Sequence, residues 1–278
     1  MDSFVAHKKK DDLLKRLQAL DSLLIAFSGG VDSTFLLAAA HQALGPKILA
    51  VTATSVTFSK AEQKEAEAFT RERSIEHILF RSDETGLPEF RHNGPDRCYY
   101  CKKRLFERLW TFAQEHHIAY LAHAANVDDL SDYRPGERAA REMGALAPLV
   151  DAGLNKKEIR YLSQEMGLPT WDKPSMACLA SRFPYGEMIT EEKLAMVGRG
   201  EALLARLGFR QYRVRYHGDV ARIEVMPDDF ETITNSQNRR RIIDAFREIG
   251  FLHIALDLEG YVSGSLNRAL PSESGDGE

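Results

Sequence analysis

The sequence predicts an α/β fold, a parallel sheet with helices on both faces, followed by a smaller α+β domain. Strand-like and helix-like segments alternate from the N-terminus, an order that is typical of such a sheet. Near Pro184 the order changes to a long helix, a hairpin, another helical stretch and one last strand. A chain of 278 residues is long enough for one large domain and a smaller one.

The first domain is predicted over residues 1–180. Its first strand, 23–27, is an unbroken apolar run, and a buried helix is expected at 34–40. Ser59 is a good N-cap for a helix over 60–73. Ligands of parallel sheets bind beyond the carboxyl ends of the strands. The other predicted elements are strands at 48–54, 76–80 and 118–124, a short extended segment at 147–150, and helices at 11–19, 102–116 and 156–166.

The second domain is predicted over residues 181–270, with the boundary inside 172–190. Two segments with alternating apolar residues flank the turn His217-Gly218-Asp219, as expected for a β-hairpin. Residues 271–278 have the composition of a disordered tail. The predicted elements are a helix at 190–207, hairpin strands at 212–219 and 221–225, a helix at 228–249 and a strand at 253–258.

Composition and charge narrow the class of protein. No apolar run approaches the roughly 20 residues of a membrane span, and the first ten residues lack the apolar core of a signal peptide. We therefore expect a cytoplasmic protein with no membrane partner. The net charge of −4 argues against a nucleic-acid partner, although it leaves room for a local basic patch. In a reducing cytosol, three cysteines are expected to be thiols or metal ligands rather than a disulfide framework.

The segment Ser28-Gly29-Gly30-Val31-Asp32-Ser33 joins the first strand to a buried helix. Backbone N–H groups and the helix dipole meet at such a junction and form an anion site, which glycines let a phosphate approach closely. The pattern is neither a Walker A loop nor a dinucleotide fingerprint. It resembles the PP-loop of the ATP pyrophosphatases, which split ATP into AMP and pyrophosphate. The alternative is an ordinary strand-to-helix turn.

The cysteines form a second motif. Cys98 and Cys101 make a CxxC unit that is expected to precede a helix, and Cys178 stands alone. Three thiolates could hold a metal, and His92 or His123 could complete a Cys₃His zinc site. A [4Fe–4S] cluster normally takes four cysteines, so three would leave one iron open. A thioredoxin-type redox pair is a weaker interpretation, because that motif opens a helix after the first strand of its own fold.

Simpler interpretations of the cysteines stay open. Cys98 and Cys101 could be packed thiols, and Cys178 a small core residue. Pro174, Arg182 and Pro184 indicate instead that Cys178 lies in an exposed loop, where Arg182 would favour a thiolate.

Nearly the whole chain resembles the LarE family, the ATP-dependent sulfur transferases that make the nickel-pincer nucleotide cofactor of lactate racemase. The resemblance implies a PP-loop domain of the adenine nucleotide alpha hydrolase type, a C-terminal domain and a homo-oligomer, often a hexamer. It rests on Ser28–Ser33, Asp132-Tyr133-Arg134-Pro135-Gly136, 174–182, Pro184-Tyr185-Gly186 and Gly260-Tyr261.

The resemblance implies a two-step reaction. A carboxylate of pyridinium-3,5-biscarboxylic acid mononucleotide is adenylated, and sulfur then displaces AMP to leave a thiocarboxylate. In one branch of the family the cysteine matching Cys178 gives up its own sulfur and becomes dehydroalanine. In the other, three cysteines hold a [4Fe–4S] cluster whose open iron carries the donated sulfide. Cys98 and Cys101 make this chain look like the second branch, with sulfide or another sulfur donor as a partner.

The same resemblance suggests roles around ATP. Asp32 is expected to bind Mg²⁺, with a helix N-terminal charge as the alternative. Thr54 would meet the adenine, and Asn126 and Asp128 would face the nucleotide, although Asp128 and Asp129 could be simple turn residues. The residues expected to hold the pyrophosphate end are Ser28, Gly29, Gly30 and Ser33.

The substrate carries two carboxylates and a phosphate, so its site should contain arginines. Arg213 and Arg215 lie two apart on one strand face, where they could clamp a phosphate or simply face solvent. Tyr99 and Tyr100 could stack on the pyridinium ring or serve as packing. Glu201, Glu224 and Asp229 are interpreted as an acidic cluster that could bind substrate or a metal, and Cys178, Asp32 and Arg182 as the catalytic set.

Two other functions compete with this one. A tRNA thiolase would share the PP-loop and paired cysteines, but the negative net charge and the lack of an obvious RNA-binding module count against it. A non-catalytic iron or redox sensor would use the CxxC unit and leave the ATP loop unexplained.

Overall fold

A computed structural model describes residues 2–55, 57, 60–131, 135–175 and 177–269. The chain forms two compact units. The first unit comprises Met1–Leu87 and Asp96–Met176, and the second comprises Pro88–Pro95 and Ala177–Glu278. The predicted tail at 271–278 lies outside the described residues. The predicted fold class is confirmed, because the first unit contains a parallel sheet and the second a separate small sheet with helices.

The first unit is built on a four-stranded parallel sheet in the order β3-β2-β1-β4. Its strands are β1 (Leu23–Ala26), β2 (Ile48–Thr54), β3 (Glu76–Arg81) and β4 (Tyr120–Ala122). The chain moves from β1 to β2 and β3 on one side and then returns to place β4 on the other side of β1. The carboxyl end of β1 is therefore the topological switch point, where ligands of such sheets bind.

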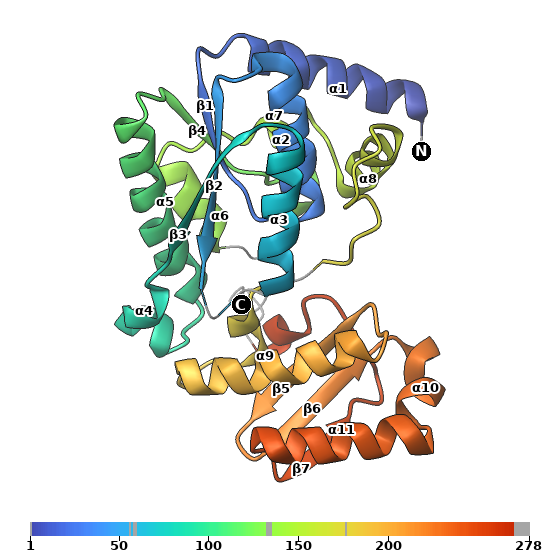
Figure 1. The fold of residues 1–278 in the computed structure, drawn as a ribbon. Helices are drawn as coiled ribbons and strands as arrows, with labels where there is room; N and C mark the ends of the chain where they lie inside the picture. Colours follow the sequence, from blue (N-terminus) through green and yellow to red (C-terminus); the bar gives the residue numbers. More distant parts are fainter. Residues whose placement is uncertain (1, 56, 58–59, 132–134, 176, 270–278) are drawn as a thin grey trace, which may run out of the picture. The chain divides into compact units, whose positions relative to one another are not determined.

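Helices cover both faces of this sheet, with α5 and α6 on one side and α1, α2 and α3 on the other (Figure 1). Leu23 and Ile25 pack with Phe35 in the core beneath α1 and α2, whereas Leu24 packs with Phe106 beneath α5. The β1 run is apolar at successive positions because both of its faces are buried. The helices are α1 (Ser3–Gln18), α2 (Val31–Leu44), α3 (Lys60–Glu72), α5 (Arg97–Glu115), α6 (Pro135–Glu142), α7 (Pro148–Asp151) and α8 (Lys156–Glu165), with 3₁₀ turns at Glu84–Gly86 and Val127–Ser131.

Two elements of the first unit differ from the prediction, one in where it starts and the other in its type of secondary structure. Helix α1 begins at Ser3 rather than at residue 11, because the Asp2 side chain accepts a hydrogen bond from the Phe4 N–H and caps the helix. The segment predicted as extended at 147–150 is the short helix α7, and the extended residue is Leu146, which bridges to Ala122 of β4.

The second unit has a three-stranded sheet in the order β5-β6-β7. The predicted hairpin is confirmed, since β5 and β6 pair antiparallel around the turn at Gly218, whose φ is +63°. The helix predicted at 228–249 is broken, because the Asn235 side chain accepts from the Asn238 N–H and starts a new helix. The elements are α4 (Pro88–Arg91), α9 (Glu191–Arg206), β5 (Tyr212–His217), β6 (Val220–Val225), α10 (Phe230–Thr234), α11 (Ser236–Ile249) and β7 (His253–Leu256), with 3₁₀ turns at Leu179–Arg182, Pro227–Asp229 and Ser265–Ala269.

No sequence feature indicated that residues 88–95 belong to the second unit. Asn93 is fully buried there, and its side-chain amide donates to the Pro184 carbonyl at 2.7 Å. Its own carbonyl accepts from the Gly186 N–H at 3.0 Å. These contacts attach the segment to the loop that precedes α9.

Across the part of the chain that the structure describes, helices with both the length and the apolar character needed to span a bilayer are absent.

The core of the first unit offers a stability test. Leu37 of α2 is fully buried, so Leu37→Ala should lower the free energy of unfolding by about 2–5 kcal/mol through lost burial and a residual cavity. The matched control is Leu258→Ala, at a side chain that is 87% exposed, with an expected change within about 0.5 kcal/mol. Urea denaturation followed by circular dichroism measures both, and equal effects would contradict the described core.

Candidate functional site

The turn after β1 makes a close approach to helix α3. Gly29 has φ +71°, a left-handed conformation that side chains rarely adopt. A Cβ added at Gly29 would lie 3.2 Å from the Ala66 Cβ and 3.5 Å from the Glu62 carbonyl oxygen. Glycine is therefore required at this position both by the backbone conformation and by the neighbouring helix.

The two serines of this turn meet at the N-terminus of α2. Their hydroxyl oxygens are 3.0 Å apart, and the Ser33 hydroxyl donates to the Gly30 carbonyl at 3.2 Å. The Gly30 N–H points toward the Ser28 Oγ over a long 3.4 Å. Gly30 is the N-cap residue of α2 and makes no side-chain cap. Backbone and hydroxyl donors thus gather where the helix dipole is positive, as an anion site requires.

Asp32 follows in the first turn of α2. Its Oδ2 accepts from the Lys156 Nζ at 2.5 Å. Its Oδ1 is buried and has no hydrogen-bond partner among the described residues. Burial raises the pKa of Asp32, and the neighbouring ammonium of Lys156 opposes that rise. A buried carboxylate oxygen that lacks a partner is a suitable ligand for a hard divalent cation, so Asp32 fits Mg²⁺.

Two lysines that the sequence interpretation missed contact the turn. Lys156 pairs with Asp32, and the Nζ of Lys173 donates to the Gly29 carbonyl at 3.2 Å. Lys173 also lies 2.8 Å from a Glu65 carboxylate oxygen and 3.5 Å from one of Glu62. Both lysines come from α8 or the segment after it, far along the chain, so no local pattern could have revealed them.

The other residues predicted to meet ATP lie at the carboxyl ends of β2 and β4. The Thr54 hydroxyl donates to the Phe80 carbonyl at 3.1 Å. Asn126 is buried, and its Oδ1 accepts from the Asp128 N–H at 2.9 Å. Asp129 accepts from the Asn126 N–H at 3.0 Å, and Asp128 accepts from the Lys156 N–H at 2.9 Å, contacts that suit turn residues, while a role for Asp128 at the nucleotide stays a prediction.

The CxxC unit lies inside helix α5 and not before it. The helix begins at Arg97, so Cys98 and Cys101 occupy its first turns, three residues apart on one face. The buried Arg97 lies 3.6 Å from the Cys98 sulfur through its Nη2. Cys178 belongs to the second unit, just before the 3₁₀ turn Leu179–Arg182. Among the described side chains, no group of three or more His, Cys, Asp or Glu could hold a metal.

Tyr99 packs against helix α6. Its hydroxyl donates to a Glu142 carboxylate oxygen at 2.5 Å, which raises the pKa of the phenol. Its ring meets that of Tyr100 edge-on and carries the Arg138 guanidinium at 4.3 Å. These contacts support the packing interpretation, and stacking on a pyridinium ring stays a prediction. The predicted motif residues 132–134 lie outside the described residues.

The second unit contains a buried network of arginines and glutamates. Arg182 is only 1% exposed, so it is not part of the exposed loop expected around Cys178, whereas Ser175 and Ala177 are exposed and Cys178 is half-buried. Its guanidinium binds both carboxylate oxygens of Glu201 at 2.6 and 3.0 Å. Arg215 binds both oxygens of Glu224 at 2.9 and 2.8 Å. The acidic-cluster interpretation is therefore corrected, because both glutamates are engaged in buried ion pairs.

This network joins neighbouring elements around Arg213. Glu201 of α9 also accepts from the Val214 N–H of β5 at 3.0 Å, and Arg215 donates to the Ser181 carbonyl at 2.8 Å. Arg213 is 3% exposed, so it is not a solvated surface residue. Its guanidinium lies 4.8 Å above the Tyr261 ring. Burial, with the nearby Arg182, lowers the pKa of Arg213.

Buried charge in this network is net positive. Among the described residues of the second unit, the buried charged side chains are three arginines and two glutamates. Gly260 supports the arrangement, because its φ is +75° and a Cβ there would lie 2.8 Å from the Val225 carbonyl oxygen. The turn at Gly260 places Tyr261 against β6, where its N–H donates to that same carbonyl. The result is a preorganised region that favours an anion.

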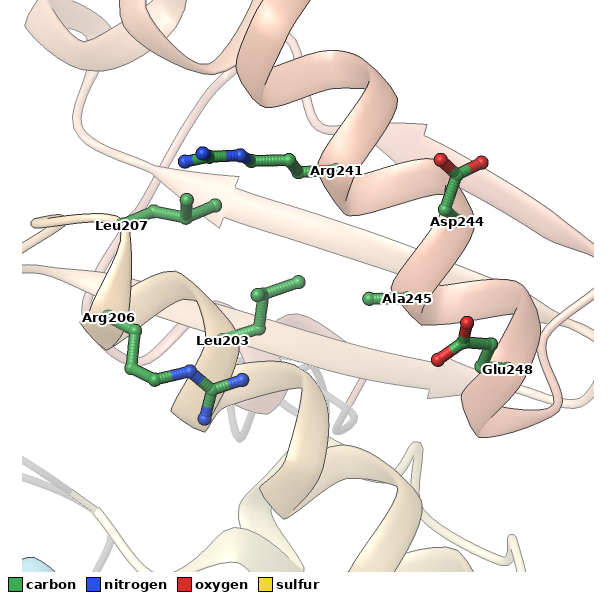
Figure 2. Close-up of a pocket in the computed structure, with 7 residues that line it drawn as sticks. All are labelled: Leu203, Arg206, Leu207, Arg241, Asp244, Ala245 and Glu248. Carbon is green, nitrogen blue, oxygen red and sulfur yellow. The ribbon is translucent and has the colours of Figure 1, made fainter.

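An open cavity of about 450 Å³ lies elsewhere in the second unit, between α9 and α11 (Figure 2). Leu203, Leu207 and Ala245 are half-buried in its lining, and the charged residues around them are exposed. None of the predicted site residues contributes to it. The full lining is Leu203, Arg206, Leu207, Arg241, Asp244, Ala245 and Glu248.

His123 offers a pH test. It follows β4 and is 6% exposed, and burial, aided by the charge of Lys102, lowers its pKa to about 3. An unfolded histidine binds a proton near pH 6.5. Stability from the neutral imidazole is therefore complete above pH 6.5 and is lost as the pH falls toward 3, at up to about 1.4 kcal/mol per pH unit.

His123→Gln should make the loss of stability below pH 6.5 shallower, measured by urea denaturation at a series of pH values. The exposed His92, replaced by Gln, is the matched control. A pH dependence identical in wild type and His123→Gln would contradict the assigned environment.

Comparisons with known proteins identify relatives of this chain. No family model matches it. A pyridinium-3,5-bisthiocarboxylic acid mononucleotide synthase of Lactiplantibacillus plantarum is 36% identical over 267 residues, 94% of this chain and 95% of the relative. An uncharacterized protein of Synechocystis is 43% identical over 94% of this chain and 98% of its own length. An uncharacterized protein of Methanocaldococcus jannaschii is 28% identical over 92% of this chain and 96% of its own. Given the identity to the synthase and its coverage, this chain belongs to the LarE family.

Proposed function

We propose that this protein is an ATP-dependent sulfur transferase that converts a carboxylate of pyridinium-3,5-biscarboxylic acid mononucleotide into a thiocarboxylate. The observation that carries the proposal is the similarity along nearly the whole chain to a synthase of the bisthiocarboxylic acid nucleotide. The anion site after β1 supports the use of ATP, since a carboxylate must be activated before sulfur can replace its oxygen. A cytoplasmic location and homo-oligomeric assembly belong to the same proposal.

In the first step, a substrate carboxylate oxygen attacks the α-phosphorus of ATP and pyrophosphate leaves. The N–H groups and hydroxyls at Ser28, Gly30 and Ser33 would bind the departing phosphates. Asp32 would hold Mg²⁺ through its buried Oδ1, and the cation would neutralise charge that develops on the leaving group. Thr54 and Asn126, at the ends of β2 and β4, would line the nucleotide side of this edge.

The buried arginines of the second unit would bind the acidic substrate. The net positive charge of the network suits a phosphate or a carboxylate, and the paired glutamates hold Arg182 and Arg215 in defined orientations. Arg213, backed by the Tyr261 ring, is the residue we assign to the phosphate. Glu201 and Glu224 would then act through the arginines they hold, and Tyr99 would contact the pyridinium ring.

In the second step, sulfur forms a bond to the activated carboxyl carbon, and the bond from that carbon to the AMP oxygen breaks. We assign Cys178 to this sulfur-transfer step. Cys98 and Cys101, on one face of α5, are proposed to join Cys178 in holding a [4Fe–4S] cluster. Such a cluster, when bound, would supply the sulfur and spare the cysteine. If no cluster forms, Cys178 itself would be the sulfur donor.

The adenylation step can be measured directly. Purified protein with ATP and Mg²⁺ should release pyrophosphate only when the biscarboxylate nucleotide is present, as measured by a coupled pyrophosphate assay. Arg213→Met should raise the KM for this nucleotide by about tenfold or more, because a buried charge-assisted contact is lost. The exposed Arg247, replaced by Met, is the matched control.

Two outcomes would overturn this assignment. Release that depends on tRNA and not on the pyridinium nucleotide would establish a tRNA thiolase. Release without any acceptor would indicate simple ATP hydrolysis.

The source of sulfur has its own test. Anaerobically purified and reconstituted protein should contain about four irons per chain, as a [4Fe–4S] cluster requires. Cys101→Ala and Cys178→Ala should each lower that content. Mass spectrometry after turnover should find Cys178 intact. Loss of H₂S from Cys178, in protein that lacks iron, would replace this proposal with sacrificial donation.

A further inference from the structure

Lys173 directly precedes the cysteine motif at 174–182 and was not predicted as a site residue, yet its ammonium contacts the turn after β1. The side chain is only 16% exposed. Its Nζ approaches three acceptors, the Gly29 carbonyl oxygen at 3.2 Å and carboxylate oxygens of Glu65 at 2.8 Å and Glu62 at 3.5 Å. An ammonium has three protons, so each of these acceptors can be served.

The backbone of Lys173 is held as firmly as its side chain. Arg160 of α8 donates to the Trp171 carbonyl and to the Lys173 carbonyl, each at 2.7 Å. The Lys173 N–H donates to the Thr170 carbonyl at 3.0 Å. The segment after α8 therefore presents this lysine from a defined position, and the lysine is not a mobile surface side chain.

The Gly29 C=O that Lys173 contacts belongs to the same peptide as the Gly30 N–H. In a planar trans peptide the C=O and the N–H point in opposite directions. The Gly29 C=O accepts from Lys173 on one side of this peptide, and the Gly30 N–H points to the opposite side, toward the Ser28 Oγ. That contact is long, at 3.4 Å, so the N–H can exchange it for a better acceptor.

We propose that Lys173 is a positioning residue that orients the Gly29–Gly30 peptide, so that the Gly30 N–H faces the phosphates of ATP. The inference rests on the proposed function in assuming that ATP binds after β1. It assigns to Lys173 a role in nucleotide affinity, exerted through the backbone and without contact to the reacting atoms.

A purely electrostatic role makes a different prediction. Glu62 and Glu65 bring negative charge close to the turn, and Lys173 also neutralises that charge. If neutralisation were the whole effect, removing the Glu65 carboxylate would compensate for removal of the lysine. If orientation of the peptide matters, removing Glu65 cannot restore what Lys173 does.

The first experiment measures binding without chemistry. Isothermal titration calorimetry with α,β-methylene ATP and Mg²⁺ compares wild type with Lys173→Met, for which we expect about tenfold weaker binding from loss of a charge-assisted hydrogen bond. Lys173→Arg, which keeps a charged donor, should recover most of the affinity. Lys157→Met, at an exposed lysine on α8, is the matched control and should bind like wild type. Equal affinities of wild type and Lys173→Met would overturn the inference.

The double variant Lys173→Met/Glu65→Gln separates the two roles. A persisting loss of affinity supports positioning, and recovery to the wild-type value overturns it in favour of charge neutralisation. In the pyrophosphate assay, Lys173→Met should raise the KM for ATP and leave kcat nearly unchanged, whereas a general folding defect would lower kcat as well.

Failure of this inference is distinguishable from failure of the proposed function. If wild type binds the analogue but shows no release with the biscarboxylate nucleotide, the proposed reaction fails and the affinities still decide the role of Lys173. If wild type releases pyrophosphate and Lys173→Met binds the analogue equally well, only the inference fails. If wild type does not bind the analogue, both fail.

Discussion

The close approach of the turn after β1 to helix α3 is the constraint on which the first unit's site depends. Gly29 adopts a left-handed conformation with Ala66 close to it, so a side chain at this position would be strained and crowded. After this turn the chain enters α2 with Gly30 as its N-cap and with Asp32 and Ser33 in the first turn. The parallel order of the sheet makes this the switch point, so the donors gather where a ligand can enter.

In both units, the basic side chains of the candidate site contact acidic or carbonyl partners in defined positions. In the first, Lys156 and Lys173 approach the turn from α8 and the segment after it. In the second, Arg182 and Arg215 bind glutamates in bidentate fashion. A buried charge that lost its partner would be strongly destabilising, so replacing one member of such a pair should cost more stability than replacing an exposed charge. The same pairing leaves rigid guanidinium groups, which suits recognition of an acidic substrate.

The strands of the first unit could be predicted closely, because apolar runs such as β1 and β2 are buried on both faces. Two errors arose where a single polar side chain decides the local structure. Asp2 caps α1 and extends it toward the N-terminus, and Asn235 divides one predicted helix into two. Lys9, in the early part of α1, is further held by both carboxylate oxygens of Glu158, a contact that no local pattern reveals.

In the candidate site, too, some features could be predicted from the sequence and others could not. The sequence by itself determined the chemistry of the turn from Ser28 to Ser33 and the presence of three cysteines, because residue types and short spacings carry that information. Only the tertiary structure decided that Arg182 is buried against Glu201 and that Lys173 reaches Gly29. The physical reason is that these partners are distant in the chain. Their contacts follow from how helices and strands pack, and local propensity does not encode that packing.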